Sequence, residues 1–313
     1  MQRPELIDAR PVPRPSLWIW AGIVVLVAAV FIYDLFTNGN YRWDVVADHL
    51  FDPRVLSAVV WTLILTVGAM VLGITMAVTM AVMRMSTNPI LRGVAWAYIW
   101  FFRGTPIFTQ LIFWGLFVVL WPTITLGIPF GPELFSVDSN VFYTPALFAI
   151  IGLGLNEGAY LSEIVRAGLN SVDKGQWEAA TALGMKRSKT LWRIVMPQAM
   201  RVIVPPTGNE TISMLKTTSL VLAVPVSLEL QFVTNAIGNK AFLPIPLLIV
   251  AAIWYLFITS VLMVFQSRLE RYYGKGFDDS EADRGKVKGM SKRQQAILAS
   301  GTVHDDPNLE VTP

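Results

Sequence analysis

The sequence lacks cysteine altogether and holds only two histidines, His49 and His304. Without cysteine the chain has no disulfide, no thiolate metal site and no cysteine nucleophile. The two histidines are too far apart in the sequence to indicate a metal site, since such sites need clustered ligands. Charged residues make up only 15% of the chain, against about 25% in soluble domains. The net charge of +3 is also too small to indicate binding to nucleic acid.

Motifs of catalysis are absent as well. The sequence has no Gly-x-x-x-x-Gly-Lys-Ser/Thr phosphate loop, no Gly-x-Ser-x-Gly elbow and no His-Glu-x-x-His motif. The basic stretch 184–190, GMKRSKT, lacks the second glycine that a phosphate loop places before its lysine. We therefore expect this chain to have no ATPase site, no catalytic residue, no metal and no cofactor of its own, and not to be an enzyme.

Apolar residues are abundant, at 54% of the chain. They concentrate in six segments, at about 17–36, 55–83, 90–121, 141–165, 202–225 and 244–267. About 20 apolar residues in a helix cross the roughly 30 Å of bilayer hydrocarbon. The sequence therefore predicts an all-α polytopic membrane protein with six transmembrane helices in contact with lipid. The first segment is long for a signal peptide and no small-x-small cleavage site follows it, so we interpret it as a retained span.

The distribution of basic residues predicts the orientation. If alternate connections are cytoplasmic, 20 of the 25 Lys and Arg residues lie on the side that holds both termini. Cytoplasmic loops carry such an excess, so both termini are expected in the cytoplasm. Residues 1–16 and 272–313 have the composition of disordered cytoplasmic tails. The proline-containing stretch 122–140 has no basic residue and is expected to form a short extracytoplasmic cap.

One cytoplasmic connection, residues 173–197, is too polar to be a span and too regular to be a simple loop. Its first part, QWEAATAL, consists of good helix formers. Gly184 then interrupts the pattern, at a point where glycine lets the chain turn. A second helical run from Lys186 to Met196 is expected to end at Pro197. The pattern predicts a helix–turn–helix beside the membrane.

Two basic residues, Arg103 and Lys216, fall inside apolar segments, where an unpaired charge costs several kcal/mol. Gly104 and Pro106 are expected to break the helix that carries Arg103 and to expose backbone groups to a cavity. The alternative is a structural role, in which Arg103 or Lys216 pairs with a carboxylate such as Glu163 or Glu210 and holds helices together. The sequence leaves structural pairing and lining of a pathway equally open.

Lys216 belongs to a polar stripe. Asn209, Ser213 and Lys216 are spaced to lie on one helix face, with Glu210 and Thr217 beside them. Such a stripe must face the bundle interior or water rather than lipid. In the preceding segment, Glu163 and Arg166 are three residues apart, which favours a helical ion pair.

The order of these features resembles a known family. Glu178-Ala-Ala, three residues, Gly184, nine residues and Ile194-x-Met-Pro197 resemble the EAA loop of ABC-importer permeases, whose pattern ends in Ile-x-Leu-Pro. Met196 for leucine is the departure from that pattern. The stretches around Arg103, 159–168, 175–180, 208–210 and Lys216 are similar to the subfamily that imports polar amino acids. The resemblance covers about residues 55–271.

The resemblance implies a type I importer permease in a bacterial cytoplasmic membrane. It implies a five-helix core at 55–271, so the span at 17–36 is an extra N-terminal helix. It also implies a second permease copy or a sister permease, two ATP-binding subunits that hold ATP and Mg, and an extracytoplasmic solute-binding protein. Residues of the loop implied to couple to the ATPase are Gln176, Glu178, Ala179, Ala180, Gly184 and Pro197. Candidates for the substrate path are Arg103, Thr105, Glu163, Asn209, Glu210, Ser213 and Lys216.

Two other functions fit the same sequence. A channel or secondary transporter would use Arg103 and Lys216 as selectivity or coupling charges and would need no ATPase. A membrane enzyme would use Glu157, Glu163 or Glu210 as acid or base. The carried amino acid stays open, whether acidic, amide, basic or cystine.

Overall fold

The computed structural model describes residues 15–128, 133–224 and 226–274. The tails predicted at 1–16 and 272–313 therefore lie almost wholly outside the described residues. In chain order the first elements are α1 (Pro15–Thr37), η1 (Gly39–Tyr41), α2 (Trp43–Leu50), α3 (Pro53–Arg84), α4 (Pro89–Gly104), α5 (Ile107–Gly115), α6 (Phe117–Leu120), β1 (Thr123–Gly127) and β2 (Glu133–Asp138). The others are η2 (Ser139–Val141), α7 (Pro145–Asn170), α8 (Lys174–Ala182), α9 (Arg187–Thr190), η3 (Leu191–Val195), α10 (Met196–Thr217), η4 (Thr218–Ala223), α11 (Leu230–Ala241) and α12 (Pro244–Gly274).

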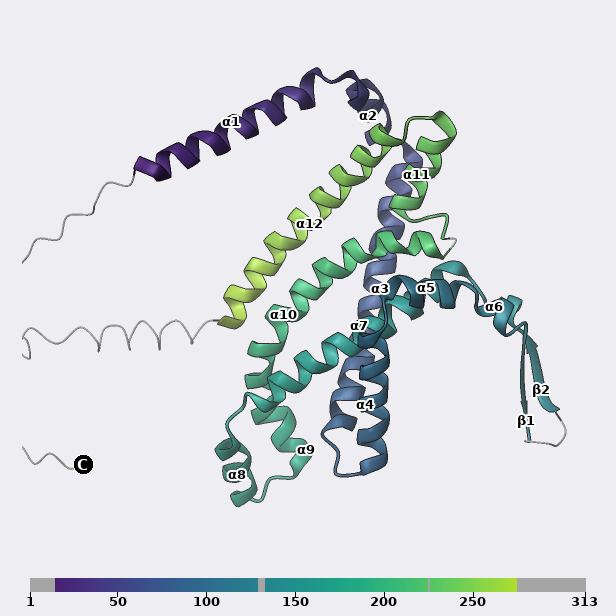
Figure 1. Ribbon diagram of the computed structural model, residues 1–313. Coiled ribbons are helices and arrows are strands. Elements are labelled where there is room, and N and C mark those ends of the chain that lie inside the picture. The colour runs from purple at the N-terminus through teal and green to yellow at the C-terminus, as the bar shows by residue number, and fades with distance from the viewer. Residues whose placement is uncertain (1–14, 129–132, 225, 275–313) are drawn as a thin grey trace, which may run out of the picture.

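The predicted all-α class is confirmed, with one addition. Helices form the whole bundle, and a single antiparallel hairpin, β1–β2, projects from it (Figure 1). The hairpin falls in the stretch expected to be an irregular external cap. Its strands are rich in β-branched side chains such as Ile124, Thr125 and Val137, which favour extended structure.

Among the described residues, four helices are long and apolar enough to cross a membrane: α1, α3, α7 and α12. The other two predicted spans are interrupted. The segment 90–121 is divided into α4, α5 and α6, and the segment 202–225 is formed by α10 and the short 3₁₀ turn η4. The number of six transmembrane helices therefore stays a prediction.

Three of the long elements begin in the same way. Asp52, Asn88 and Thr144 each cap a helix by accepting a hydrogen bond from a backbone N–H in its first turn, and each is followed by proline. Proline suits this position because its missing N–H would have no partner there. At α3 the Arg54 side chain also donates to Asp52, with an N···O distance of 2.6 Å. This hydrogen bond lowers the pKa of Asp52 to about 2.

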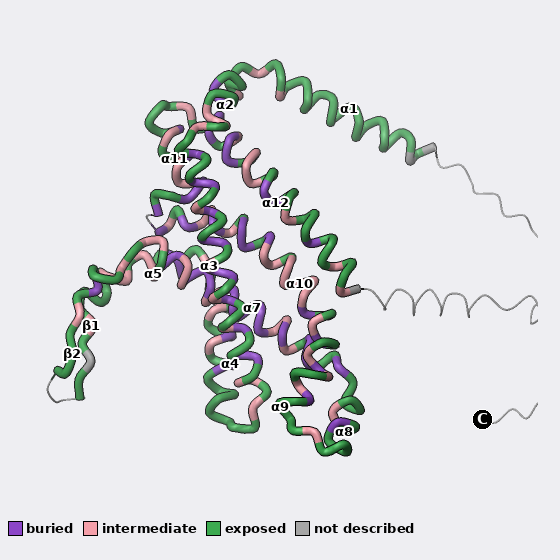
Figure 2. Tube along the Cα trace, turned by 180° about the vertical axis from the view of Figure 1, so that it is seen from behind, coloured by how far each residue is buried: buried purple, intermediate pink, exposed green. Residues whose placement is uncertain are grey.

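The centre of the bundle is the pair α3 and α7, which cross at close range. A Cβ on Gly154 would lie 2.8 Å from Leu72 Cβ, and one on Gly158 would lie 2.7 Å from Met76 Cβ. Only glycine allows the two helices to approach this closely. A second apolar cluster joins α2, α11 and α12 to the outer end of α3. Buried residues accordingly concentrate along α3 and α7 in Figure 2.

Helix α1 leaves the rest of the bundle. Its side chains are exposed along the length of the helix. Within the span from Trp18 to Thr37, no residue of the most apolar stretch is buried (Figure 2). A helix that is apolar on all sides and packs on no protein is stable only in lipid. Its position agrees with the extra N-terminal span that the resemblance implies.

Candidate functional site

Helix α8 lies at the end of the bundle opposite α2 and α11, between α7 and α10 (Figure 1). Asp173 caps its first turn by accepting from Gly175 N at 2.6 Å. At its other end Gly184 has a φ of +71°, in the left-handed region. Gly184 N donates to Thr181 O and Met185 N donates to Ala180 O, which is a Schellman motif. The predicted turn at Gly184 is therefore confirmed.

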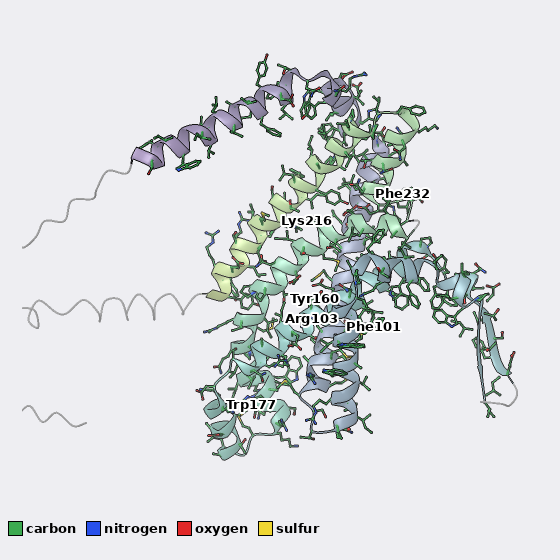
Figure 3. All side chains as sticks on the ribbon, in the orientation of Figure 1. Phe101, Arg103, Tyr160, Trp177, Lys216 and Phe232 are labelled. Atoms are coloured by element: carbon green, nitrogen blue, oxygen red, sulfur yellow. The ribbon has the colours of Figure 1, made fainter. Side chains whose placement is uncertain are left out.

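The two faces of α8 differ sharply. Trp177 packs against the core of the bundle and Ala180 is completely buried (Figure 3 labels Trp177). Gln176, Glu178 and Ala179 are exposed. Ala180 is among the residues that the resemblance implies to couple to the ATPase, but its side chain is already enclosed within this chain. Ala180 and Trp177 instead fix α8 to the membrane helices.

The chain does not end its helical course at Pro197, and that prediction is wrong. It passes from α9 through the π-helical turn η3 directly into α10, which begins at Met196. In the turn, Met196 N donates to Leu191 O, five residues back. Such a turn and the first positions of a helix both tolerate a residue without an N–H, so Pro197 fits here. The connection 173–197 is thus continuous with α10.

The predicted break between α4 and α5 is confirmed, and two unpredicted side chains complete it. Pro106 has no N–H to donate to Phe102 O four residues earlier. Gln110 Nε2 and Asn156 Nδ2 donate to that carbonyl at 3.0 and 2.9 Å. Gln110 also donates to Thr105 Oγ1 at 2.7 Å. The signal in the sequence is a proline four residues after a helical residue, which leaves the carbonyl of that residue without its N–H donor. Amide side chains elsewhere in the chain can then supply the donor.

The cation of Arg103 lies over an aromatic ring. Its guanidinium carbon is 5.2 Å from the centre of the Tyr160 ring of α7, and the two residues lie together in Figure 3. A cation at this distance from a ring face is attracted by its quadrupole. Glu163, one of the expected partners, pairs with Arg166 instead, at 2.5 Å. The helical pair Glu163–Arg166 is therefore confirmed.

Neither Arg103 nor Lys216 forms an ion pair with any residue that the structure describes. Asn209, Ser213 and Lys216 all lie on the helix α10, and all three are exposed, while Glu210 is half-buried. The polar stripe is therefore present on α10, and no other element within the described residues covers it. Lys216 lies farther along the bundle than Arg103 and Tyr160 (Figure 3), so the two cations do not meet.

A buried carboxylate was not predicted as part of the path. Glu157 of α7 is only 6% exposed. Its Oε1 is buried without a hydrogen-bond partner among the described residues. Glu210 lies half-buried on α10, a helix that packs against α7. A glutamate within an apolar helix is itself a signal of function, since such a position is costly for a charge.

Comparisons with known proteins agree with this geometry. Residues 69–275 match the family described as binding-protein-dependent transport system inner membrane component. An arginine transport system permease protein of Corynebacterium glutamicum is 47% identical over 99% of this chain and 94% of its own length. A histidine/lysine/arginine/ornithine transport system permease protein of Salmonella typhimurium is 34% identical over 67% of this chain and 86% of its own.

A crystal structure of an amino acid ABC transporter with histidines is similar in fold and sequence. Its matching chain has a TM-score of 0.58 and 31% identity, over 70% of this chain and 94% of that chain. The family match spans well over half of the sequence and includes the EAA loop, α7, α10 and α12. This chain therefore belongs to the family of binding-protein-dependent transport system inner membrane components, as a permease subunit of an ABC importer without an ATPase site of its own.

Proposed function

We propose that this permease carries a cationic amino acid, with arginine as the first candidate, into the bacterial cytoplasm. The observation that carries the proposal is the acidic side chain of Glu157, buried inside the bundle, with Glu210 half-buried on α10, a helix that packs against α7. Glu157 has no hydrogen-bond partner at Oε1 among the residues described, so its demand for a donor or a cation is unmet. A cation beside this buried carboxyl group would favour its ionised form and pair with it. A relative that is 47% identical to this chain is an arginine transport system permease protein.

The groups in the path suit both ends of such a substrate. Glu210 is half-buried on α10, and Glu157 is buried on the neighbouring helix α7. The guanidinium or ammonium of the substrate side chain would meet this pair. Either Arg103 or Lys216, which form no ion pair with described residues, would meet the α-carboxylate. Thr105, Asn209 and Ser213 would supply neutral hydrogen-bonding groups along the same path.

The exposed stripe on α10 supports a two-subunit pore. Asn209, Ser213 and Lys216 are costly to expose to hydrocarbon. A second permease subunit facing this stripe would enclose it in a water-filled cavity. The second subunit is either another copy of this chain or a sister permease, and a solute-binding protein would deliver substrate from outside.

The loop around α8 would transmit force. Gln176, Glu178 and Ala179 on the exposed face would seat in a groove of an ATP-binding subunit, one under each permease subunit. ATP and Mg are held by that partner. Because η3 joins the loop to α10 without a break, movement of α8 would tilt the helix that carries the polar stripe. With both termini in the cytoplasm, as the basic residues predict, α8 lies on the side of the ATPase.

Uptake kinetics test the proposal. The complete complex in proteoliposomes should take up labelled arginine, and excess lysine or ornithine should compete where glutamate does not. Glu210→Gln should raise KM for arginine at least severalfold with kcat little changed, because it removes an attraction made in the bound state. Glu178→Gln, on the loop, is the matched control and should lower kcat without raising KM. Equal competition by glutamate, or an unchanged KM in Glu210→Gln, would refute the cationic substrate.

A further inference from the structure

Helix α10 is weakened at its middle by two consecutive prolines. Pro205 and Pro206 lie inside the helix, which continues through them. Neither has an N–H to donate to the carbonyl four residues before it, so the helix lacks two successive backbone hydrogen bonds. The next residue adds to this effect, because Thr207 Oγ1 donates to Ile203 O at 2.7 Å, a type of side-chain bond that often bends helices. The middle of α10 is therefore the point at which this helix bends most easily.

The two parts of α10 on either side of the prolines differ in what they pack on. The loop-side part, residues 196–204, is held by α7, where a Cβ on Gly168 would lie 2.3 Å from Ile203 Cγ1. The stripe-side part, residues 207–217, also reaches the second apolar cluster, where Leu215 is completely buried together with residues of α11 and α12. Figure 1 shows α10 running from α9 towards α11, with α12 beside it. The coupling element α8 is thus connected to one part of α10, and the polar stripe lies on the other.

A buried glutamine of α12 is bonded to α10 at the joint between these parts. Gln266 Nε2 donates to Pro205 O at 2.7 Å and to Glu270 Oε1 at 2.9 Å. The side chain of Gln266 lies in the interior, since the residue is only 8% exposed. Gly208 leaves the space for its amide, because a Cβ on Gly208 would lie 1.5 Å from Gln266 Oε1. Helix α12 is therefore attached to α10 at the joint itself, where a change of angle between the two parts displaces the attachment least.

We propose that residues 205–208 are a hinge in α10 and that Gln266 is the positioning residue that holds its pivot on α12. When α8 moves, the loop-side part turns at the hinge, while the stripe-side part stays on α12. The angle between the two parts then changes within one helix, whereas a rigid α10 would tilt as a whole. A hinge absorbs such a change in the backbone of a few residues. The inference rests on the proposed function only in that an ATP-binding subunit moves α8, and it goes further by locating the bend.

Two distances measured by electron paramagnetic resonance test the hinge. The chain lacks cysteine, so spin labels attach only to introduced cysteines. Gln198→Cys on the loop-side part and Leu222→Cys just after the stripe-side part are each combined with Leu256→Cys on α12, and all three native side chains are exposed. The labelled chain is diluted with unlabelled chain, and its complex with the ATP-binding subunit is measured in nanodiscs with and without a non-hydrolysable ATP analogue.

The hinge predicts different results for the two distances. The 198–256 distance should shift by about 4 Å when the analogue binds, because position 198 lies about 12 Å from the hinge and a sharp helix kink turns by roughly 20° or more. The 222–256 distance should stay constant. Equal shifts in both distances would show that α10 moves as a rigid body, and they would overturn the hinge. The absence of a shift in the 198–256 distance would overturn it as well.

Removal of the prolines separates a hinge from a packing role. Pro205→Ala combined with Pro206→Ala restores both backbone hydrogen bonds, so the unfolding temperature should not fall. The same double variant should lose the 198–256 shift and lower kcat for arginine uptake at least severalfold with KM unchanged. Pro89→Ala, at the first position of α4, is the matched control and should change neither quantity. A normal kcat or a lower unfolding temperature in the double variant would overturn the hinge.

Gln266→Met tests the pivot, because it keeps the size of the side chain and removes its hydrogen-bond donor. The stripe-side part should then move against α12, so the 222–256 distance should shift or broaden when the ATP analogue binds. An unchanged 222–256 distance would show that Gln266 does not hold the pivot.

The outcomes separate this inference from the proposed function. The two distances do not depend on which amino acid the importer carries. If arginine is taken up with ATP but both distances shift equally, the proposed function stands and the hinge alone fails. If the 198–256 distance alone shifts in a complex that transports no cationic amino acid, the hinge is supported and the proposed substrate is refuted.

Discussion

Replacement of Gly184 tests whether the turn after α8 sets the affinity for the ATP-binding subunit. Gly184 has a φ of +71°, and a Cβ built on it has no neighbouring atom within 4 Å. Substitution therefore causes no clash, and its whole effect is on the backbone. An L-residue in the left-handed region costs about 1–2 kcal/mol. Asparagine adopts this region more readily than alanine, whereas a β-branched residue adopts it least readily.

The expected loss of affinity follows from that energy. About 1–2 kcal/mol corresponds to a factor of roughly 5–30 in an equilibrium constant. If the Schellman geometry at Gly184 holds the exposed face of α8 in its docking position, Gly184→Ala should weaken binding of the ATP-binding subunit by about that factor. The affinity of Gly184→Asn for the ATP-binding subunit should stay closer to that of the wild type, and Gly184→Val should bind most weakly. The membrane bundle should keep its unfolding temperature, since Gly184 makes no core contact.

The assay is a titration of labelled ATP-binding subunit onto the permease in lipid nanodiscs. Dissociation constants for the wild type and the three variants give the series directly, and thermal unfolding of each nanodisc preparation is the control. The reasoning would be refuted if the Gly184→Ala variant bound the ATP-binding subunit as tightly as the wild type does. It would also be refuted if Gly184→Asn and Gly184→Ala lost affinity equally. The cause would then be the presence of a side chain rather than the backbone conformation.

Three further predictions concern the bundle. Gln110→Leu should lower the free energy of unfolding by about 0.5–1.5 kcal/mol, because it removes one of the two side-chain donors to the partly buried Phe102 carbonyl; chemical denaturation measures it, and an unchanged value would contradict the role. Gly208→Ala places a Cβ 1.5 Å from Gln266 Oε1, so it should destabilise the α10–α12 contact, and Gln266→Ala in the same chain should recover part of the loss in a double-mutant cycle of thermal stability. Asp52, with its pKa lowered to about 2 by the Arg54 hydrogen bond, should contribute stability that is complete above its usual pKa of 3.8 and is lost as pH falls towards 2. The difference in unfolding temperature between wild type and Asp52→Asn should therefore be constant from pH 8 to 5 and narrow below pH 4, and a difference that grows on acidification would contradict this.

The sequence predicted best where a local rule determines the backbone. Gly184 follows a run of helix formers, and the left-handed turn is there. Pro106 interrupts an apolar helix, and α4 ends two residues before it. Glu163 and Arg166 are one helical turn apart, and they pair. In each case the residues that decide the structure are neighbours in the chain.

The errors came from contacts between distant segments. The Phe102 carbonyl is satisfied by Asn156 of another helix, which no local pattern indicates. Ala180 is buried because α8 folds back onto the bundle. The Glu-Ala-Ala motif alone did not show that Ala180 lies on the face of α8 that contacts the bundle. Pro197 was expected to end a helix, but the π turn before it absorbs the missing donor. The projection of the β1–β2 hairpin away from the helices is likewise visible only in three dimensions (Figure 1).

ATP-dependent uptake of arginine tests the account most directly. Proteoliposomes would hold this chain alone or with its ATP-binding subunit, with the solute-binding protein added outside. The account predicts accumulation only when ATP and the ATP-binding subunit are both present, and its loss in Glu178→Arg together with release of that subunit. Uptake of arginine by vesicles that contain this chain alone, without ATP, would contradict the account and indicate a channel or secondary transporter.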